Sequence, residues 1–164
     1  MTDIVSKATR SRMMSGIRGE NTKPEIRIRQ LLHRDGFRFR LHGRDLPGRP
    51  DIVLPRYRAV VFVHGCFWHG HQENCHLFKL PGTRRAFWTA KIVGNRRHDK
   101  EALAALVARG WRVATIWECA LKGRTRLLET TVAAHLAVWL RGDAPLLTIE
   151  GQRTSPDKTS GKTL

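Results

Sequence analysis

Twelve residues, from His64 to Cys75, contain two of the three cysteines of the chain, three histidines and two adjacent large aromatic side chains. They directly follow an apolar run, residues 59–63, that predicts a buried strand. Thiols and imidazoles are preferred ligands of zinc, and imidazole is the most frequent acid–base group in enzymes. We therefore expect metal ligands, bases and stacking surfaces to lie together at one end of a strand.

The thiols and one imidazole predict a zinc site. Cys66, His71 and Cys75 come from one loop. Cys119 follows a later predicted strand, so one tetrahedral metal would join two strands of the sheet. His69 competes with His71 as the nitrogen ligand, and Cys119 is chosen mainly because it is the only cysteine left. The alternative is that the cysteines only fill the core. Because three cysteines cannot all pair and no signal peptide is recognised, we expect a reducing cytoplasm.

A second metal site, with oxygen ligands, is predicted where two short strands meet. Asp51 opens one strand and His64 ends the next, so an antiparallel pair would bring them together at the margin of the sheet. A carboxylate and a main-chain carbonyl, here that of Val63, are oxygen ligands suited to Mg²⁺. His64 and His69 would then transfer protons beside the metal. Taken alone, Asp51 after Pro50 is typical of a turn.

Two further carboxylates have ordinary explanations. Glu25 completes a capping box with Thr22 at the start of a helix that has Pro24 in its first turn and ends at Gly36. Asp99 has the position of an exposed charge on a later helix. Their functional interpretation depends on the nearby histidines and on the basic character of the chain.

Exposed aromatic side chains are predicted beside the metal ligands. Phe67 and Trp68 lie in a loop too tight for both to reach the core easily, and such side chains can stack on bases or wedge between them. Trp88, among basic residues of the next helix, either joins them or packs in the core. The remaining tryptophans are predicted core residues: Trp111, Trp117 and Trp139.

The formal net charge of +16 and the isoelectric point near 11.3 indicate a polyanionic partner, of which nucleic acid is the usual one. The excess belongs to residues 1–142, because residues 143–164 contain three acidic and three basic side chains. A merely soluble basic protein is the plain alternative. Binding to a membrane surface is disfavoured, because no basic amphipathic helix stands apart from the core.

The elements that must position these residues follow from hydrophobic periodicity. Besides the helix at Thr22, strands are predicted at 37–41, 51–54, 58–63 and 111–117, and helices at 83–93, 95–109 and 124–140. The order α-β-β-β-α-α-β-α predicts an α/β fold, a mixed sheet flanked by helices. We divide the chain into a basic arm, a single domain and a disordered tail, at residues 1–20, 21–142 and 143–164. The arm contains Lys7, Arg10 and Arg12.

These residues lie in segments that resemble the very-short-patch-repair (Vsr) DNA mismatch endonucleases. The resemblance extends from about Lys7 to Lys122. The matching segments are KATRS (7–11), LPGRPD (46–51), VFVHGCFWH (61–69), LFK (77–79), FW (87–88), GWRV (110–113) and WECAL (117–121). The resemblance implies a restriction-endonuclease-like fold with a structural zinc. It further implies Mg²⁺-dependent nicking of double-stranded DNA 5′ to the thymine of a T:G mismatch, the product of 5-methylcytosine deamination.

The resemblance also implies roles for single residues. Asp51 matches the metal-binding aspartate, His69 the histidine that activates water, and His64 a histidine that assists phosphate and leaving-group chemistry. Glu25 and Asp99 match carboxylates that hold water molecules around the metal. The zinc ligands of the family match Cys66, His71, Cys75 and Cys119. The aromatic residues that intercalate match Phe67, Trp68 and Trp88. The arm that clamps DNA matches the segment with Lys7, Arg10 and Arg12.

Two departures from the family pattern concern the metal sites. The stretch between His71 and Cys75 is longer than in the best-known member, and Val63 replaces a threonine. The second change is harmless if the metal takes only the main-chain carbonyl.

Two other functional hypotheses are consistent with part of the residue pattern. A zinc-stabilised DNA-binding module would need no equivalent of Asp51, His64 and His69. A restriction enzyme of the same fold would lack the aromatic wedge. We expect a monomer in the bacterial cytoplasm, associated with the nucleoid; recruitment of mismatch-repair proteins is left open.

Overall fold

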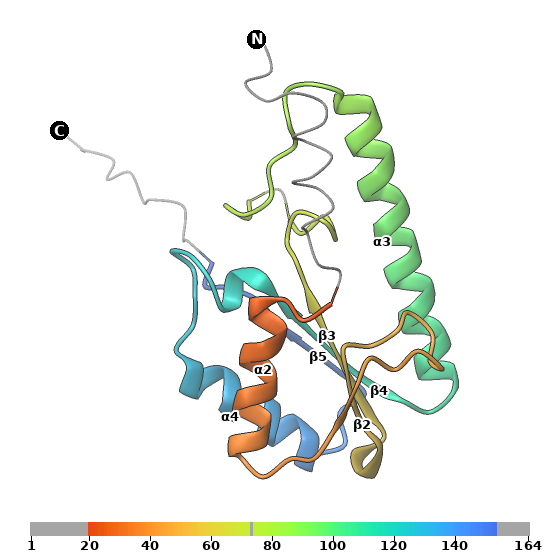
Figure 1. The fold of residues 1–164 in the computed structure, drawn as a ribbon, viewed down its shortest axis with the longest axis vertical. Coiled ribbons are helices and arrows are strands. Elements are labelled where there is room, and N and C mark those ends of the chain that lie inside the picture. The colour runs from red at the N-terminus through yellow and green to blue at the C-terminus, as the bar shows by residue number, and fades with distance from the viewer. Residues whose placement is uncertain (1–19, 73, 154–164) are drawn as a thin grey trace, which may run out of the picture.

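The computed structural model describes residues 20–72 and 74–153 (Figure 1). The predicted arm residues Lys7, Arg10 and Arg12, and the end of the predicted tail, lie outside the described residues. The helices are α2 (Lys23–Arg34), α3 (Arg85–Ala108) and α4 (Glu129–Arg141). The strands are β1 (Arg40–Leu41), β2 (Ile52–Leu54), β3 (Ala59–His64), β4 (Arg112–Trp117) and β5 (Leu146–Ile149), with 3₁₀ turns at Pro55–Tyr57 and Glu118–Ala120.

The five strands form one mixed sheet in the order β1-β2-β3-β4-β5. The first two pairings are antiparallel, with Ile52 opposite Val61 in the β2–β3 pair. The last two are parallel, with Val63 opposite Ile116 and Ile116 opposite Ile149. Strand β3 lies at the centre and all six of its residues are buried. Its apolar run therefore forms the buried strand that the sequence predicts, and it ends at His64.

Helices cover both faces of the sheet, as the α/β prediction requires (Figure 1). Helices α2 and α4 pack together on one face, where Ile28, Leu32 and Leu136 join the alternate side chains of β2, β3 and β4 in the larger core cluster. Helix α3 covers part of the other face, where Leu106 packs on Val60 and its neighbours. In the described part of the chain, no helix is long and apolar enough to cross a membrane.

The start of α2 has the predicted cap, but its Glu25 side chain is buried and not at the surface. Thr22 Oγ1 accepts a hydrogen bond from the Glu25 amide at 3.4 Å. The Glu25 carboxylate accepts from the Asn21 amide, at 2.8 Å, and the side chain is only 2% exposed. The capping box therefore does not explain Glu25 fully, because an ordinary capping carboxylate lies at the surface.

Helix α3 corrects the prediction of two helices at 83–93 and 95–109. It is one helix of 24 residues. Gly94, the apparent break, lies inside it, and a Cβ at this position would meet nothing within 4 Å. A glycine costs a helix only about 1 kcal/mol, so the helix formers on both sides and the packing against the sheet decide the outcome.

The second correction concerns the predicted tail. Leu146–Ile149 form β5, which extends the sheet beside β4, so the disordered tail does not begin at residue 143. Other differences are limited to element ends. Strand β1 is two residues rather than the five of 37–41, and α4 begins at Glu129 rather than at Arg124. The turn-like composition of residues 142–145 predicts no strand, because β5 forms only through its pairing with β4, which is distant in sequence.

Candidate active site and metal centre

A cleft of about 890 Å³ opens at the end of β3, between the start of α2 and the middle of α3. It gathers most of the residues for which the sequence predicts catalysis, Mg²⁺ binding or stacking on bases. The residues of this set that line it are Glu25, Asp51, Val63, His64, Phe67, Trp68, His69 and Asp99. The antiparallel β2–β3 pair brings Asp51 to the end of β3, where His64 lies, as predicted from the order of the strands.

Two carboxylates face each other in this cleft. Asp51 Oδ2 accepts a hydrogen bond from the Val63 amide at 2.7 Å. Burial, followed by the repulsion of Glu25 close by, raises the pKa of Asp51 to about 7. Arg29 stands 3.3 Å from the Glu25 carboxylate and offsets part of this repulsion. Two desolvated carboxylates whose negative charge is only partly offset would suit a divalent cation that prefers oxygen ligands, such as Mg²⁺.

The predicted carbonyl ligand at Val63 remains a prediction. The contact shown here is made by the main-chain amide of Val63, which orients Asp51. The Val63 side chain is buried in the larger core cluster. Valine at this position is therefore explained by core packing.

His69 and Asp99 form a hydrogen-bonded pair in the same cleft. His69 Nδ1 donates to Asp99 Oδ2 at 2.7 Å, because a carboxylate can only accept. The hydrogen on Nδ1 leaves the lone pair on Nε2, so His69 can act as a base through this atom. Asp99 is thus no ordinary exposed helix charge: it orients the imidazole.

His64 has a different environment from His69. The two rings stack with centroids 3.8 Å apart and planes 5° apart. His64 is buried, and its Nδ1 has no hydrogen-bond partner among the described residues. Burial, followed by the repulsion of a charged His69, lowers the pKa of His64 to about 3. His64 is therefore a neutral imidazole at physiological pH, with an unpaired polar atom.

The continuity of α3 is what brings its side chains into the cleft. Lys91, Asn95 and Asp99 follow each other at intervals of four residues and all line the cleft. Asn95 Nδ2 donates to the main-chain carbonyl of Trp68 at 2.8 Å, and Arg96 Nε donates to that of Gly70 at 2.6 Å. The helix thus holds the loop that follows β3. Neither Asn95 nor Arg96 was predicted from the sequence, because their partners are main-chain carbonyls 27 and 26 positions away along the chain.

The predicted wedge residues form one aromatic cluster. Phe67, Trp68 and Trp88 contact each other edge to face, with ring centroids 5.1 to 5.9 Å apart. All three are half-buried, and Phe67 and Trp68 also line the cleft. Trp88 therefore belongs with the loop aromatics and not with the core. Of the tryptophans predicted as core, Trp139 is buried there, whereas Trp111 and Trp117 are only half-buried.

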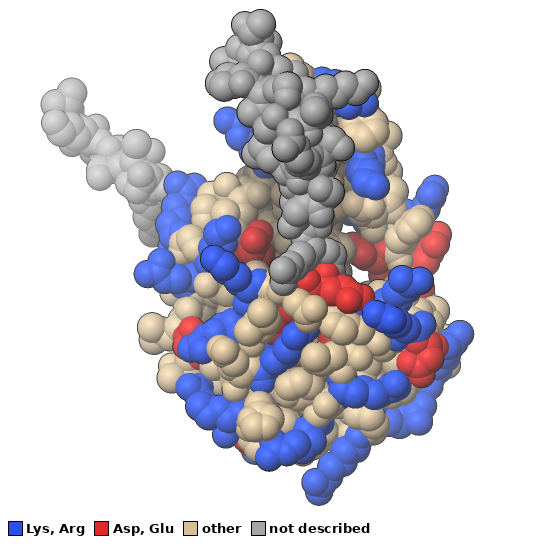
Figure 2. Space-filling view, viewed as in Figure 1, with Lys and Arg blue, Asp and Glu red and all other residues tan. Residues whose placement is uncertain are grey.

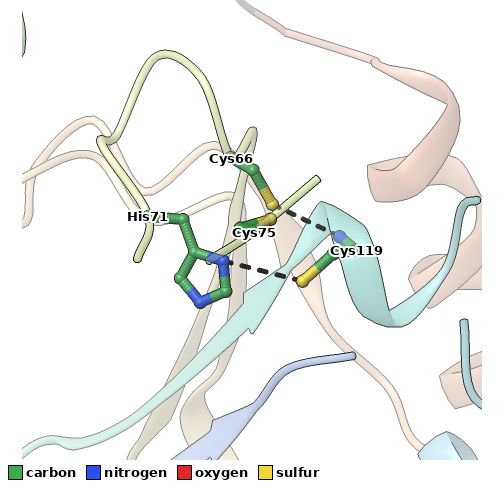
Figure 3. Close-up of side chains that lie close together, drawn as sticks. All are labelled: Cys66, His71, Cys75 and Cys119. Atoms are coloured by element: carbon green, nitrogen blue, oxygen red, sulfur yellow. Dashed lines mark hydrogen bonds between the residues drawn. The ribbon is translucent and has the colours of Figure 1, made fainter. Parts of the chain in front are cut away.

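The thiols and His71 lie on the other side of the same loop. The possible ligand atoms of Cys66, His71, Cys75 and Cys119 all lie within 4.8 Å of one another (Figure 3). His71 Nδ1 is 3.6 Å from Cys119 Sγ, and the Cys119 amide donates to Cys66 Sγ at 3.4 Å. Three thiols and one imidazole that converge from two segments fit a tetrahedral zinc ion.

The predicted competition between two histidines for this cluster is resolved by geometry. His71 points to the thiols, whereas His69 points to Asp99 in the cleft. Hydrogen bonding from the Cys66 thiol and from the Gly151 amide lowers the pKa of Cys119 to about 6. One thiol of the group is thus set to ionise near neutral pH, which a metal ligand requires.

The surface around these sites is strongly basic. Figure 2 shows Lys and Arg side chains spread over most of the visible face, with few Asp or Glu side chains among them. Lys91 lies in the cleft itself, and Arg44 and Arg49 line its other side. A phosphate backbone would therefore meet positive charge around the acidic centre of the cleft.

Comparison with known proteins places these features in context. The family model described as DNA mismatch endonuclease Vsr matches residues 2–76. The type II nicking enzyme V.XorIIP of Xanthomonas oryzae pv. oryzae is 53% identical over 121 residues, which are 74% of this chain and 88% of that protein. The DNA mismatch endonuclease Vsr of Escherichia coli is 43% identical over 152 residues, which are 93% and 96% of the two chains.

Proposed function

Because the chain belongs to the Vsr family of DNA mismatch endonucleases, we propose that it nicks double-stranded DNA 5′ to the thymine of a T:G mismatch. The reaction is a Mg²⁺-dependent hydrolysis of one phosphodiester bond, as very short patch repair requires after deamination of 5-methylcytosine. The observation that carries the proposal is the cleft, which combines paired carboxylates and a His–Asp pair with an aromatic cluster at its edge.

Asp51 and the main-chain carbonyl of Val63 would hold the Mg²⁺ ion, and the carboxylates of Glu25 and Asp99 would hold water molecules bound to it. When bound, Mg²⁺ supplies a Lewis acid that polarises the scissile phosphate and offsets developing negative charge. The Val63 amide keeps Asp51 oriented toward the cleft. Without a cation, Asp51 tends to bind a proton instead, since its pKa is raised to about 7.

His69 acts as the base. Its Nε2 takes a proton from the attacking water while Nδ1 donates to Asp99, which stabilises the resulting imidazolium. His64 stays neutral and can donate one N–H to a phosphate oxygen or to the leaving group. As the new phosphorus–oxygen bond forms, the bond to the leaving oxygen breaks and this oxygen takes a proton from solvent water, so the products are one hydroxyl end and one phosphate end.

The aromatic cluster provides the basis for choosing a mismatch. Opening a base step costs a few kcal/mol, and least at a mismatched pair. Stacking on an aromatic side chain returns about 1–3 kcal/mol per base. Phe67, Trp68 and Trp88 are pre-assembled by mutual contact, so little side-chain entropy is lost on insertion.

The remaining features serve binding and stability in this proposal. A zinc ion on Cys66, His71, Cys75 and Cys119 stabilises the loop that carries the wedge, within a restriction-endonuclease-like domain. Lys7, Arg10 and Arg12 of the basic arm, residues 1–20, clamp the DNA. One nick needs one active site, so a monomer is sufficient.

The deciding experiment compares nicking of a duplex with one T:G pair and of its T:A control, each with Mg²⁺ and with EDTA. We expect a single nick 5′ to the mismatched thymine, only in the T:G duplex and only with Mg²⁺. Equal cutting of both duplexes would refute mismatch specificity. Binding of DNA by folded protein without cutting under any condition would indicate a DNA-binding module.

A further inference from the structure

We propose that the three residues after β5, Glu150 to Gln152, form an outer support of the Cys–His metal centre, with Glu150 as a positioning residue for His71. Residue 150 lies in the stretch that the sequence predicts as a disordered tail. The inference rests on the proposed metal centre and deepens it, because it assigns the residues that hold two of its ligands in place.

The first contact joins Glu150 to the imidazole ligand. Glu150 Oε2 is 2.8 Å from His71 Nε2, and the same oxygen accepts a hydrogen bond from the Gln72 side chain at 2.7 Å. A carboxylate only accepts hydrogen bonds, so the hydrogen of the neutral imidazole is on Nε2. The lone pair is then on Nδ1, the atom that faces Cys119 Sγ at 3.6 Å. Glu150 thus selects the tautomer that binds metal through Nδ1.

The second contact joins the next residue to a thiol ligand. The Gly151 amide donates to Cys119 Sγ at 3.3 Å. The approach is close: a Cβ at this position would lie 2.6 Å from the Cys119 carbonyl oxygen and 2.4 Å from Thr125 Oγ1. An N–H group that points at a thiolate stabilises its negative charge. Glycine here lets the backbone approach the metal ligand.

A short network then anchors this segment. The Gln152 amide donates to the Thr125 carbonyl at 2.8 Å, and Thr125 Oγ1 donates to the Cys119 carbonyl at 3.1 Å. The segment is thereby tied to the turn that carries Cys119 and does not hang free in solvent.

Sheet topology explains how this segment reaches the centre. Strands β4 and β5 are parallel, with Ile116 opposite Ile149. Parallel strands end at the same edge of a sheet. The residues that follow Ile149 therefore arrive where Cys119 follows Ile116. Strand β5 serves the metal centre by delivering Glu150 and Gly151 to its ligands.

The support also reaches the cleft through one side chain. His71 stacks on Trp117 with centroids 4.1 Å apart and planes at 20°. Trp117 also meets His64 edge to face, with centroids 5.2 Å apart. Trp117 thus contacts both His71, which Glu150 positions, and the buried histidine of the cleft.

The test measures metal retention in full-length, zinc-loaded protein with Glu150→Ala, Glu150→Gln and the control Asp143→Asn, which removes an exposed carboxylate before β5. The readouts are the zinc dissociation constant by chelator competition and the visible spectrum of the Co²⁺-loaded protein. We expect Glu150→Ala to weaken zinc binding about 10- to 100-fold. Glu150→Gln retains an acceptor oxygen for Nε2–H and should lose less, and Asp143→Asn should match the parent.

A readout on the ring separates positioning from general stability. In ¹⁵N spectra of the zinc-loaded parent, His71 should show a protonated Nε2 and a metal-bound Nδ1. In Glu150→Ala, a mixture or the opposite pattern is expected, and Glu150→Gln should restore the parent pattern. Equal zinc affinity of Glu150→Ala and the parent, with unchanged His71 signals, would overturn the proposal. A parent that binds no zinc would instead refute the metal centre itself.

Discussion

The Cys–His cluster and the carboxylate–histidine cleft both include residues of the loop that follows β3, yet their polar groups are arranged in opposite ways. In the centre, His71 and Cys119 each have a partner that satisfies them, Glu150 and the Gly151 amide. In the cleft, Asp51 faces another carboxylate, and the buried His64 Nδ1 is unpaired among the described residues. The first arrangement favours holding a metal ion and the second favours reacting, because unsatisfied groups are stabilised when a cation and substrate bind.

The largest contrast is expected from removing one charge in the cleft. Asp51→Asn should lower the nicking rate by about three orders of magnitude or more, because it removes the several kcal/mol that a metal ion contributes to the reaction. It should leave DNA binding unchanged. The Tm of the metal-free protein should rise, because repulsion with Glu25 is relieved while the Asn oxygen still accepts from the Val63 amide. Nicking assays, gel shifts and calorimetry measure these three effects; a fall in Tm would show that Asp51 is structural.

The matching change in the metal centre should have the opposite sign in stability. Cys66→Ala should abolish zinc binding and lower the free energy of unfolding by several kcal/mol, because a metal centre contributes directly to folding. Nicking should fall with the folded fraction. Zinc analysis and thermal unfolding of parent and variant provide the check, with Cys66→Ser as a second variant of similar size. A metal-free preparation of the parent with an unchanged Tm would contradict a structural role.

Truncation of the aromatic cluster should lower the discrimination between T:G and T:A duplexes and leave the rate of the chemical step unchanged. Trp68→Ala should reduce the preference for T:G over T:A duplexes by the equivalent of about 1–3 kcal/mol, the stacking contribution of one base. Trp139→Phe, a change on α4 in the larger core cluster and outside the aromatic cluster of the loop, provides the aromatic control. Competitive nicking of the two duplexes measures the ratio. An unchanged ratio with lower stability would place Trp68 with the core residues.

The smallest effect concerns pH. Metal binding needs the Asp51 carboxylate, whose pKa is raised to about 7 by burial and by Glu25. Between pH 8 and pH 6 the ionised fraction falls about tenfold, so the Mg²⁺ concentration for half-maximal nicking should rise by about that factor. The pH dependence of folding has the opposite direction in protein without Mg²⁺. There the contribution of Asp51 to the free energy of unfolding is present below its ordinary pKa and is lost as the pH rises through about 7. Titrations of Mg²⁺ at several pH values test the first statement, and a pH-independent midpoint would contradict it.

The grouping of the candidate site residues was largely predictable from local sequence. The order of the short strands placed Asp51 beside His64, and the loop spacing placed Cys66, His71 and Cys75 together. The roles of two residues were hard to predict because each has an ordinary local explanation. Glu25 read as a helix cap and Asp99 as a surface charge, and only the cleft shows their second partners, Asp51 and His69.

What could not be predicted depends on contacts between distant segments. The predicted break at Gly94 is wrong because packing of α3 against the sheet outweighs one glycine; the predicted break separated Lys91 from Asn95 and Asp99, which share one face of the helix. The strand at Leu146–Ile149 was missed because a short parallel strand takes its stability from a neighbour, here β4, and not from its own composition.

The sequence by itself determined the types of ligand, the buried central strand, the cap of α2 and the basic character, because each is a property of neighbouring residues or of composition. The tertiary structure alone decided which histidine serves which site and that Glu150 reaches the metal centre. The physical reason is that hydrogen bonds and charge pairs act over a few ångströms in space. Only the fold brings His71 to Glu150, 79 positions away along the chain.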